Sequence, residues 1–175
     1  GEARARVDLR PYATEWSGGE ARWWVASDLG EAVTGDRLRD DHVLGIGGAS
    51  LTLAGMTMRT PVGRVLDLGT GCGIQALHAA LHARSVVATD LSRRALEFAE
   101  FNRVLNAAGD WDLREGSMLE PVAGERFDLV VSNPPFVITP RRHDVPAYEY
   151  RDGGRTGDAV VADLVRALPD VLADG

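Results

Sequence analysis

The sequence predicts an α/β fold built around a parallel β-sheet. From residue 60 onward, short apolar runs alternate with helical patterns, and a glycine-rich turn joins the first run to the first helix. The chain has 175 residues, of which 45% are hydrophobic and 26% charged, which suits one domain with a buried core. Since strands that alternate with helices run parallel, their carboxyl ends should meet along one edge of the sheet.

Residues 1–59 precede this regular pattern. We expect them to form a small helical or hairpin segment, the end of an upstream domain. The stretch 22–33 has a helical pattern, and partial alternation over 43–59 predicts a short hairpin. Aromatic side chains cluster early in this segment and predict a packing layer, with a substrate-docking surface as the alternative; they are Tyr12, Trp16, Trp23 and Trp24.

Residues 60–175 predict a second unit in which strands and helices alternate. The strands are expected over residues 62–68, 85–89, 111–114 and 127–132. Helices are expected from Ile74, from the N-cap Ser92 to about Ala108, and over 159–173, where Pro169 should break the last one. The spacing of Ile74, Leu77 and Leu81 leaves His78 and His82 off the core-facing side of the first helix.

The composition excludes several kinds of chemistry. All 19 basic residues are arginines, and without lysine a GK[ST] phosphate loop, a Schiff base or a protein-kinase site cannot form. The single cysteine, Cys72, excludes an internal disulfide and CxxC sites, and no ligand set accompanies the two histidines, so we expect no metal. The net charge of -7 disfavours a broad surface for binding nucleic acid. The sequence contains no run of 18 apolar residues, the length needed to span a membrane.

A glycine turn, Gly69–Gly73, follows the first strand directly. Glycines permit a tight turn and a close approach to a ligand, and the following helix offers free N–H groups. The spacing is GxGxG, because Ile74 stands where a dinucleotide fingerprint has its third glycine. Asp90 closes the second strand, where a carboxylate can accept hydrogen bonds from both hydroxyls of a ribose. The pattern therefore indicates a ligand with a ribose but no pyrophosphate.

The segment DLGTGCG, followed by Asp90 in VVATDLS, resembles motif I and the strand-end acid of class I methyltransferases that depend on S-adenosylmethionine (SAM). The resemblance covers about residues 60–175. It implies a Rossmann-like parallel sheet, SAM as the cofactor and S-adenosylhomocysteine as its product. Ser117 and Met118 stand where many members have an acid for the adenine amine, which leaves the Ser117 hydroxyl, backbone groups and Met118 for that contact. The cofactor residues implied are Asp67, Gly69, Thr70, Gly71, Cys72, Gly73, Asp90, Leu91, Ser117, Met118 and Asn133.

A second motif, Ser132-Asn133-Pro134-Pro135-Phe136, follows the fourth strand. It resembles the (N/D)PP(Y/F) signature of methyltransferases that act on planar nitrogen. Such a nitrogen is a poor nucleophile, because its lone pair is delocalised, and it needs acceptors for both N–H groups. The Asn133 side-chain oxygen and the Pro134 carbonyl can supply them, Pro135 restricts the backbone, and Phe136 can cover the flat target group. These four residues are the expected catalytic residues.

The residues after this motif, VITP, and a glycine-rich stretch within 141–158 resemble the HemK/PrmC branch, which methylates a glutamine side chain in translation release factors. The resemblance implies a cytoplasmic N-methyltransferase with a protein substrate. Two alternatives stay open: methylation of an exocyclic amine on an RNA or DNA base, and a non-catalytic SAM-binding protein. The loop 141–158 is a lid or a solvent loop, and the oligomeric state is open.

The fold implied by the resemblance has seven strands, whereas only four can be placed in this sequence. We therefore expect the methyltransferase domain of residues 60–175 to be incomplete at its C-terminus. On this expectation an apolar sheet edge lies unpaired beside the fourth strand.

Overall fold

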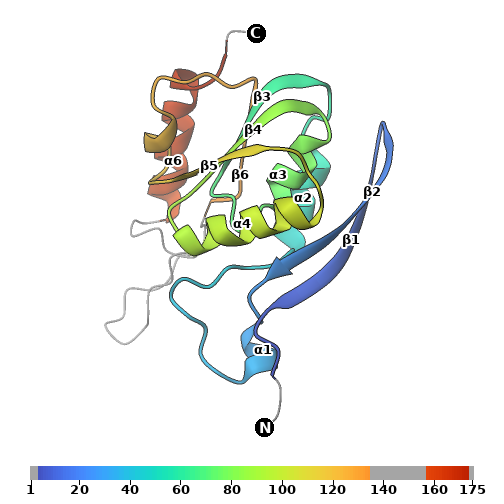
Figure 1. Ribbon diagram of the computed structural model, residues 1–175. Coiled ribbons are helices and arrows are strands. Elements are labelled where there is room, and N and C mark those ends of the chain that lie inside the picture. The colour runs from blue at the N-terminus through green and yellow to red at the C-terminus, as the bar shows by residue number, and fades with distance from the viewer. Residues whose placement is uncertain (1–3, 135–156, 174–175) are drawn as a thin grey trace.

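The computed structural model describes residues 4–134 and 157–173. Within these residues the chain forms an antiparallel two-stranded hairpin and a parallel four-stranded sheet of order β5-β4-β3-β6 (Figure 1). The predicted α/β class with a parallel sheet is confirmed. None of the helices in these two ranges is long and apolar enough to cross a membrane.

The elements of the sheet lie within two residues of their predicted bounds. The strands are β3 (Val62–Leu68), β4 (Ala83–Asp90), β5 (Trp111–Glu115) and β6 (Leu129–Ser132). The helices around them are α3 (Ile74–Ala80), α4 (Arg93–Leu105) and α6 (Gly157–Ala167), with short 3-10 turns at Glu120–Val122 and Leu168–Asp170. Ser92 caps α4 by accepting a hydrogen bond from the Ala95 N–H at 3.4 Å, and α6 ends before Pro169, as predicted.

The predicted helix over residues 22–33 is wrong. Residues Gly19–Ser27 form strand β2, which pairs with β1 (Asp8–Trp16) in a register that places Tyr12 opposite Trp23. Burial alternates in the middle of β2, where Trp23 and Val25 are buried and Trp24 is 51% exposed. The segment forms a strand rather than a helix because its apolar face packs against residues that are distant in the sequence. A local sequence pattern does not reveal such contacts.

The predicted hairpin over residues 43–59 is also wrong. This region contains helix α2 (Gly48–Met56), after a single helical turn, α1 (Glu31–Thr34). The alternation of Leu51 and Leu53 does not mark a half-buried strand, because Leu51 stays exposed and only Ala54 of this helix is buried. A long-range contact holds α2 in place: the Gln75 side chain in α3 donates a hydrogen bond of 2.8 Å to the Ser50 carbonyl.

Two apolar clusters pack on opposite faces of the parallel sheet. One face carries α3, α4 and the hairpin, so that Trp23 and Val25 share a core with Val65 and Val86. The other face carries Leu66, Val87 and Phe127 under the Glu120–Val122 turn and α6. The hairpin is therefore packed into the same core as the sheet. A domain boundary near residue 60 stays a prediction.

Strand β6 lies at one edge of this four-stranded sheet. Beyond it, a single parallel bridge joins Phe127 to Leu172. The Phe127 N–H donates to the Val171 carbonyl at 2.8 Å, and the Ala173 N–H donates to the Phe127 carbonyl at 2.9 Å. The segment after the last 3-10 turn thus comes alongside the start of the β6 region.

Candidate functional site

The glycine turn adopts a backbone that requires glycine at three positions. Gly69, Gly71 and Gly73 have φ of +72°, +56° and +83°, all in the left-handed region that disfavours other residues. A Cβ at Gly69 or Gly71 would meet nothing within 4 Å, whereas at Gly73 it would lie 3.2 Å from Ala99 and 3.1 Å from Trp111. The first two glycines therefore border open space, and the third lets helix α3 start close against α4 and β5.

Buried polar groups support this turn from below. One carboxylate oxygen of Asp67 accepts hydrogen bonds from the Thr70 hydroxyl at 2.6 Å and from the Ala76 N–H at 2.9 Å. The N–H groups of Gly69 and Thr70 both donate to the Thr89 carbonyl at 2.9 Å. Asp67 is 1% exposed, and burial raises its pKa to about 7. The Asp67 side chain thus shapes the turn rather than facing solvent.

Cys72 also points into the core. Its side chain is 3% exposed, and burial raises the pKa of the thiol to about 11. A thiol in this state is not a nucleophile at neutral pH. The predicted cofactor residues therefore divide into two sets. The side chains of Asp67, Thr70 and Cys72 are buried beneath the turn, whereas Gly69 and Gly71 border open space.

Asp90 joins the turn to the start of α4. Its two carboxylate oxygens accept hydrogen bonds from the Gly71 N–H at 2.8 Å and from the Ser92 N–H at 2.9 Å. Burial raises the pKa of this half-buried carboxyl, while the hydrogen bonds from Ser92 and Gly71 oppose the rise. Each oxygen retains acceptor capacity, so the carboxylate is held in place and can still receive hydroxyl donors.

The residues predicted after β5 lie beside Asp90. The Gly116 N–H donates a hydrogen bond of 3.0 Å to the Asp90 carbonyl, which ties the end of β5 to the end of β4. Ser117 is exposed and Met118 is half-buried with φ of +48°. Leu91, the next predicted residue, is 57% exposed.

The second motif begins where β6 ends, next to the glycine turn. Leu68 and Ser132 are paired in the register of β3 with β6, and the Ser132 hydroxyl donates to the Leu68 carbonyl at 2.8 Å. Asn133 is exposed and Pro134 is half-buried. Pro135, Phe136 and the loop residues 141–156 lie outside the described residues.

A cluster of Tyr12, Trp23 and His78 connects the hairpin to α3, and the sequence did not indicate that His78 belongs to it. His78, expected to lie off the core, is 6% exposed, which corrects that expectation. Its ring lies edge-on to Trp23, with ring centroids 5.3 Å apart, and its Nε2 is 3.0 Å from the Tyr12 hydroxyl oxygen. Burial lowers the pKa of His78 to about 4, so the ring is neutral at neutral pH. Of the four aromatic residues predicted to form a packing layer, Tyr12 and Trp23 pack against the core, whereas Trp24 is 51% exposed and Trp16 lines a cavity.

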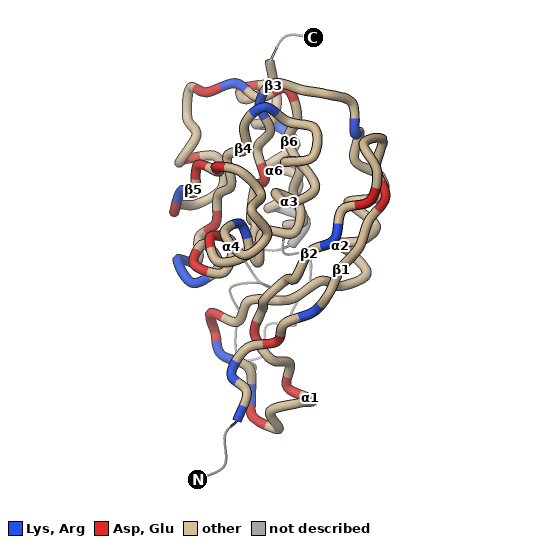
Figure 2. The backbone as a smooth tube through the Cα atoms, turned by 45° about the vertical axis from the view of Figure 1, so that its right-hand side comes forward, with Lys and Arg blue, Asp and Glu red and all other residues tan. Residues whose placement is uncertain are grey.

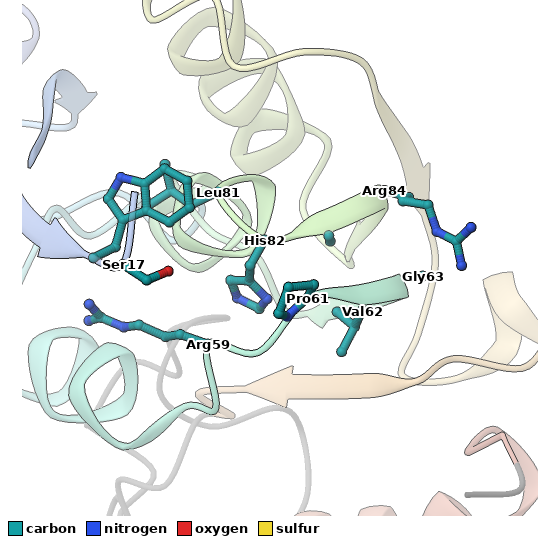
Figure 3. A pocket seen from close by; sticks show the side chains of 10 residues that line it. Ser17, Arg59, Pro61, Val62, Gly63, Leu81, His82 and Arg84 are labelled. Carbon is teal, nitrogen blue, oxygen red and sulfur yellow. The ribbon is translucent and has the colours of Figure 1, made fainter. Parts of the chain in front are cut away.

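A cavity of about 470 Å³ opens at the other end of the sheet (Figure 3). It lies at the first residues of β3 and β4, and Trp16, Arg59 and His82 line it. The Arg59 guanidinium donates to the carbonyls of Glu15 and Ala54, and the Arg84 side chain points away from the other labelled side chains. None of the predicted site residues lines this cavity, and its arginines do not converge on one point.

A model of the methyltransferase small domain family matches residues 46–146, more than half of the chain. This chain belongs to the methyltransferase small domain family. The matched range contains the glycine turn, Asp90 and Asn133.

Relatives of this methyltransferase small domain act on proteins of the translation machinery, according to their names. The chain is 44% identical over 82 residues to a release factor glutamine methyltransferase of Xylella fastidiosa, covering 46% of this chain and 30% of the relative. It is 39% identical over 117 residues to a protein of the same name from Deinococcus radiodurans, covering 60% of this chain and 41% of the relative. The matched part of this chain thus spans less than half the length of these curated relatives.

The fold is also that of solved class I methyltransferases. A 16S rRNA N2 G1207 methyltransferase of T. thermophilus, solved with AdoMet and guanosine, superposes with a TM-score of 0.63. The superposition covers 95% of this chain and 40% of the other, at 21% identity, and shows a shared fold.

The residues of this methyltransferase small domain fit SAM, the cofactor of the class. Gly69 and Gly71 border open space at the carboxyl edge of the sheet, where a side chain would otherwise stand. Asp90 presents a fixed carboxylate with acceptor capacity left for hydroxyl groups. These two features match a ligand that combines a ribose with a part that must lie close to the backbone.

Proposed function

We propose that this domain transfers a methyl group from SAM to a planar nitrogen, the side-chain amide of a protein glutamine. One observation carries the proposal: the pairing of Leu68 with Ser132 brings Asn133 and Pro134 beside the glycine turn. The glycine turn and the Asn133-Pro134 motif thus lie at one edge of the sheet, although Leu68 and Ser132, the residues that precede them, are 64 positions apart.

The proposal gives Asn133 and Pro134 the task of holding the target nitrogen. Bound SAM would supply a methyl group carried on a positively charged sulfur. The Asn133 side-chain oxygen and the Pro134 carbonyl would accept hydrogen bonds from the two N–H groups of the amide. With both hydrogens held, the nitrogen lone pair can turn out of conjugation, and positioned dipoles stabilise the positive charge that develops on nitrogen. Overall, the nitrogen exchanges one proton for the methyl group.

The cofactor would be held by residues at the ends of three neighbouring strands. Asp90 would accept hydrogen bonds from the ribose hydroxyls, with Leu91 as an apolar neighbour. The backbone at Gly69 and Gly71 would lie against the methionine part. Ser117 and Met118 would contact the adenine. The hydrogen bond from the Gly116 N–H to the Asp90 carbonyl supports this role, because it ties the end of β5 to the end of β4.

A protein substrate is favoured by the names of the relatives and by charge. Both bacterial relatives described above are named for glutamine methylation of release factors. Figure 2 shows acidic and basic residues interspersed over the described elements, and the net charge of the chain is -7. A nucleic-acid substrate would favour a basic surface. The proposal also places the protein in the cytoplasm, where translation takes place.

The identity of the acceptor can be tested directly. The protein is incubated with SAM labelled in its methyl group and a bacterial lysate, and the labelled polymer is then digested with protease or nuclease. We expect protease-sensitive label that mass spectrometry assigns to N-methylglutamine. Nuclease-sensitive label would instead support the base-methylating alternative. SAM binding without any label would support the non-catalytic alternative.

The role of Asn133 gives the first prediction. Asn133→Ala removes one acceptor for the target amide, and among the described residues Asn133 makes no hydrogen bond to the glycine turn. We therefore expect kcat to fall at least about 100-fold. The dissociation constant for SAM, measured by calorimetry, should stay within about threefold of wild type. Such a change corresponds to less than about 1 kcal/mol of binding free energy. Normal turnover by this variant would overturn the proposed mechanism.

A further inference from the structure

One buried side chain connects the glycine turn to the N-terminal hairpin. Asn102 lies on α4 and is 0% exposed. Its side-chain N–H donates a hydrogen bond of 2.8 Å to the Cys72 carbonyl, in the middle of the glycine turn. The same amide group reaches the hairpin: it accepts from the Ala26 N–H at 2.7 Å and donates to the Ala26 carbonyl at 2.9 Å.

These three bonds fix the orientation of the Asn102 amide. Both of its hydrogens are used, one by Cys72 and one by Ala26. A flipped amide would place its oxygen against the Cys72 carbonyl and its nitrogen against the Ala26 N–H. The position of the turn carbonyl is therefore tied to the position of the β2 backbone through one rigid group.

Asn106, one helical turn later, makes a matched set of bonds that does not reach the turn. It accepts from the Trp24 N–H at 2.8 Å and donates to the Trp24 carbonyl at 2.9 Å. Its second hydrogen is donated at 2.7 Å to the Asn102 carbonyl, at the C-terminal end of α4, where Asn106 is the C-cap. Together the two asparagines bind the edge of β2 as a neighbouring strand would, and only Asn102 also bonds to the glycine turn.

We propose that Asn102 is a positioning residue for the cofactor site, through which docking of the hairpin on α4 sets the conformation of the glycine turn. The inference rests on the proposed binding of SAM by that turn. Because binding linkage is reciprocal, SAM that favours the ordered turn also favours the docked hairpin. Residues 19–27 are then a working part of the cofactor site, although they lie more than 40 positions before it in the sequence.

The matched pair of asparagines supplies the test. Asn102→Ala and Asn106→Ala each remove both bonds to β2, and only the first removes the bond to the turn. The dissociation constant for SAM is measured by calorimetry at a temperature where circular dichroism shows both variants to be folded. We expect Asn102→Ala to weaken binding at least about tenfold, a change of about 1.4 kcal/mol, and Asn106→Ala to change it less than about twofold. Equal dissociation constants for the two variants would overturn the inference.

A second measurement uses the wild-type chain, in case Asn102→Ala does not fold. Amide hydrogen exchange is followed by NMR with and without saturating SAM. We expect SAM to slow exchange of the Ala26 amide at least about threefold more than exchange of the Glu20 amide near the hairpin turn, since only Ala26 is bonded to Asn102. Equal effects at the two amides would overturn the inference. Failure of the wild-type chain to bind SAM would refute the cofactor assignment itself, whereas binding with matched variants refutes only the role of Asn102.

Discussion

The glycine turn and the N-terminal hairpin are held by different kinds of contact. The turn is supported in part by near neighbours in sequence, since Asp67 bonds to Thr70 and Ala76, three and nine residues away. More distant residues, Thr89, Asp90 and Asn102, bond to it from 19 to 30 positions away. The hairpin is supported by distant residues, because Asn102 and Asn106 lie 76 and 82 positions from the backbone groups that they bind. A binding site can therefore be predicted from the sequence even when the segment that supports it, here the hairpin, cannot.

The largest expected effect tests how strictly the turn is built. Gly73→Ala places a Cβ at φ of +83° and 3.2 Å from Ala99, so we expect the free energy of unfolding to fall by about 2–4 kcal/mol. Gly109→Ala is the control, because Gly109 has φ of +79° and open space around it, and should cost about 1 kcal/mol. Urea denaturation measures both. Equal losses would mean that close packing at Gly73 contributes nothing.

An intermediate effect tests whether the hairpin depends on a neutral His78. Burial, and then the charges of Arg59 and His82, lower its pKa from 6.5 to about 4. The unfolded chain therefore binds a proton that the folded chain rejects between these values, and stability falls as the pH is lowered from about 6.5 to about 4.

The comparison with His78→Phe isolates this effect from the titration of Asp67, which both proteins share. The stability advantage of wild type over the variant should shrink by at most about 1.4 kcal/mol per pH unit across this window. Thermal or urea unfolding at several pH values measures it. A difference that stays constant with pH would contradict a buried, neutral His78.

The smallest effect distinguishes two threonines at the turn. The Thr89 hydroxyl is buried and has no hydrogen-bond partner among the described residues, so Thr89→Val should leave stability unchanged or raise it by up to about 1 kcal/mol. The Thr70 hydroxyl donates to Asp67, so Thr70→Val should lower stability by about 1–3 kcal/mol. Denaturant midpoints decide between them. A clear loss in Thr89→Val would show that this hydroxyl has a partner in solution.

The elements that could be predicted are those with local signals. Each of these elements depends on residues that are close together in the sequence. They are the strand over 62–68, the glycine turn, the N-cap Ser92 and the break before Pro169. The meeting of Asp90, Gly71 and Ser132 at one edge also followed, since parallel strands present their carboxyl ends together.

The elements that could not be predicted depend on distant partners. Trp23 and Trp24 are compatible with a helix or a strand, and only the pairing with β1 decides between them. The helical spacing places His78 outside the core, and only its contacts with Tyr12 and Trp23 bury it. The sequence contains one signal of the contact between α4 and β2. Asn102 and Asn106 are four positions apart at the end of a helix, so their side chains share a face. Two amides on one helical face can bind alternate residues of a strand, although the sequence does not say which strand.

The same asparagine pair has a consequence for aggregation. An uncovered strand edge is a template for pairing with another chain. Asn102 and Asn106 occupy the edge groups of Ala26 and Trp24 on β2. On β1, Pro11 is paired with Trp24, so its backbone also faces away from the hairpin, and it has no N–H to offer. The hairpin is thus protected at one edge by two amides and weakened as a template at the other by proline.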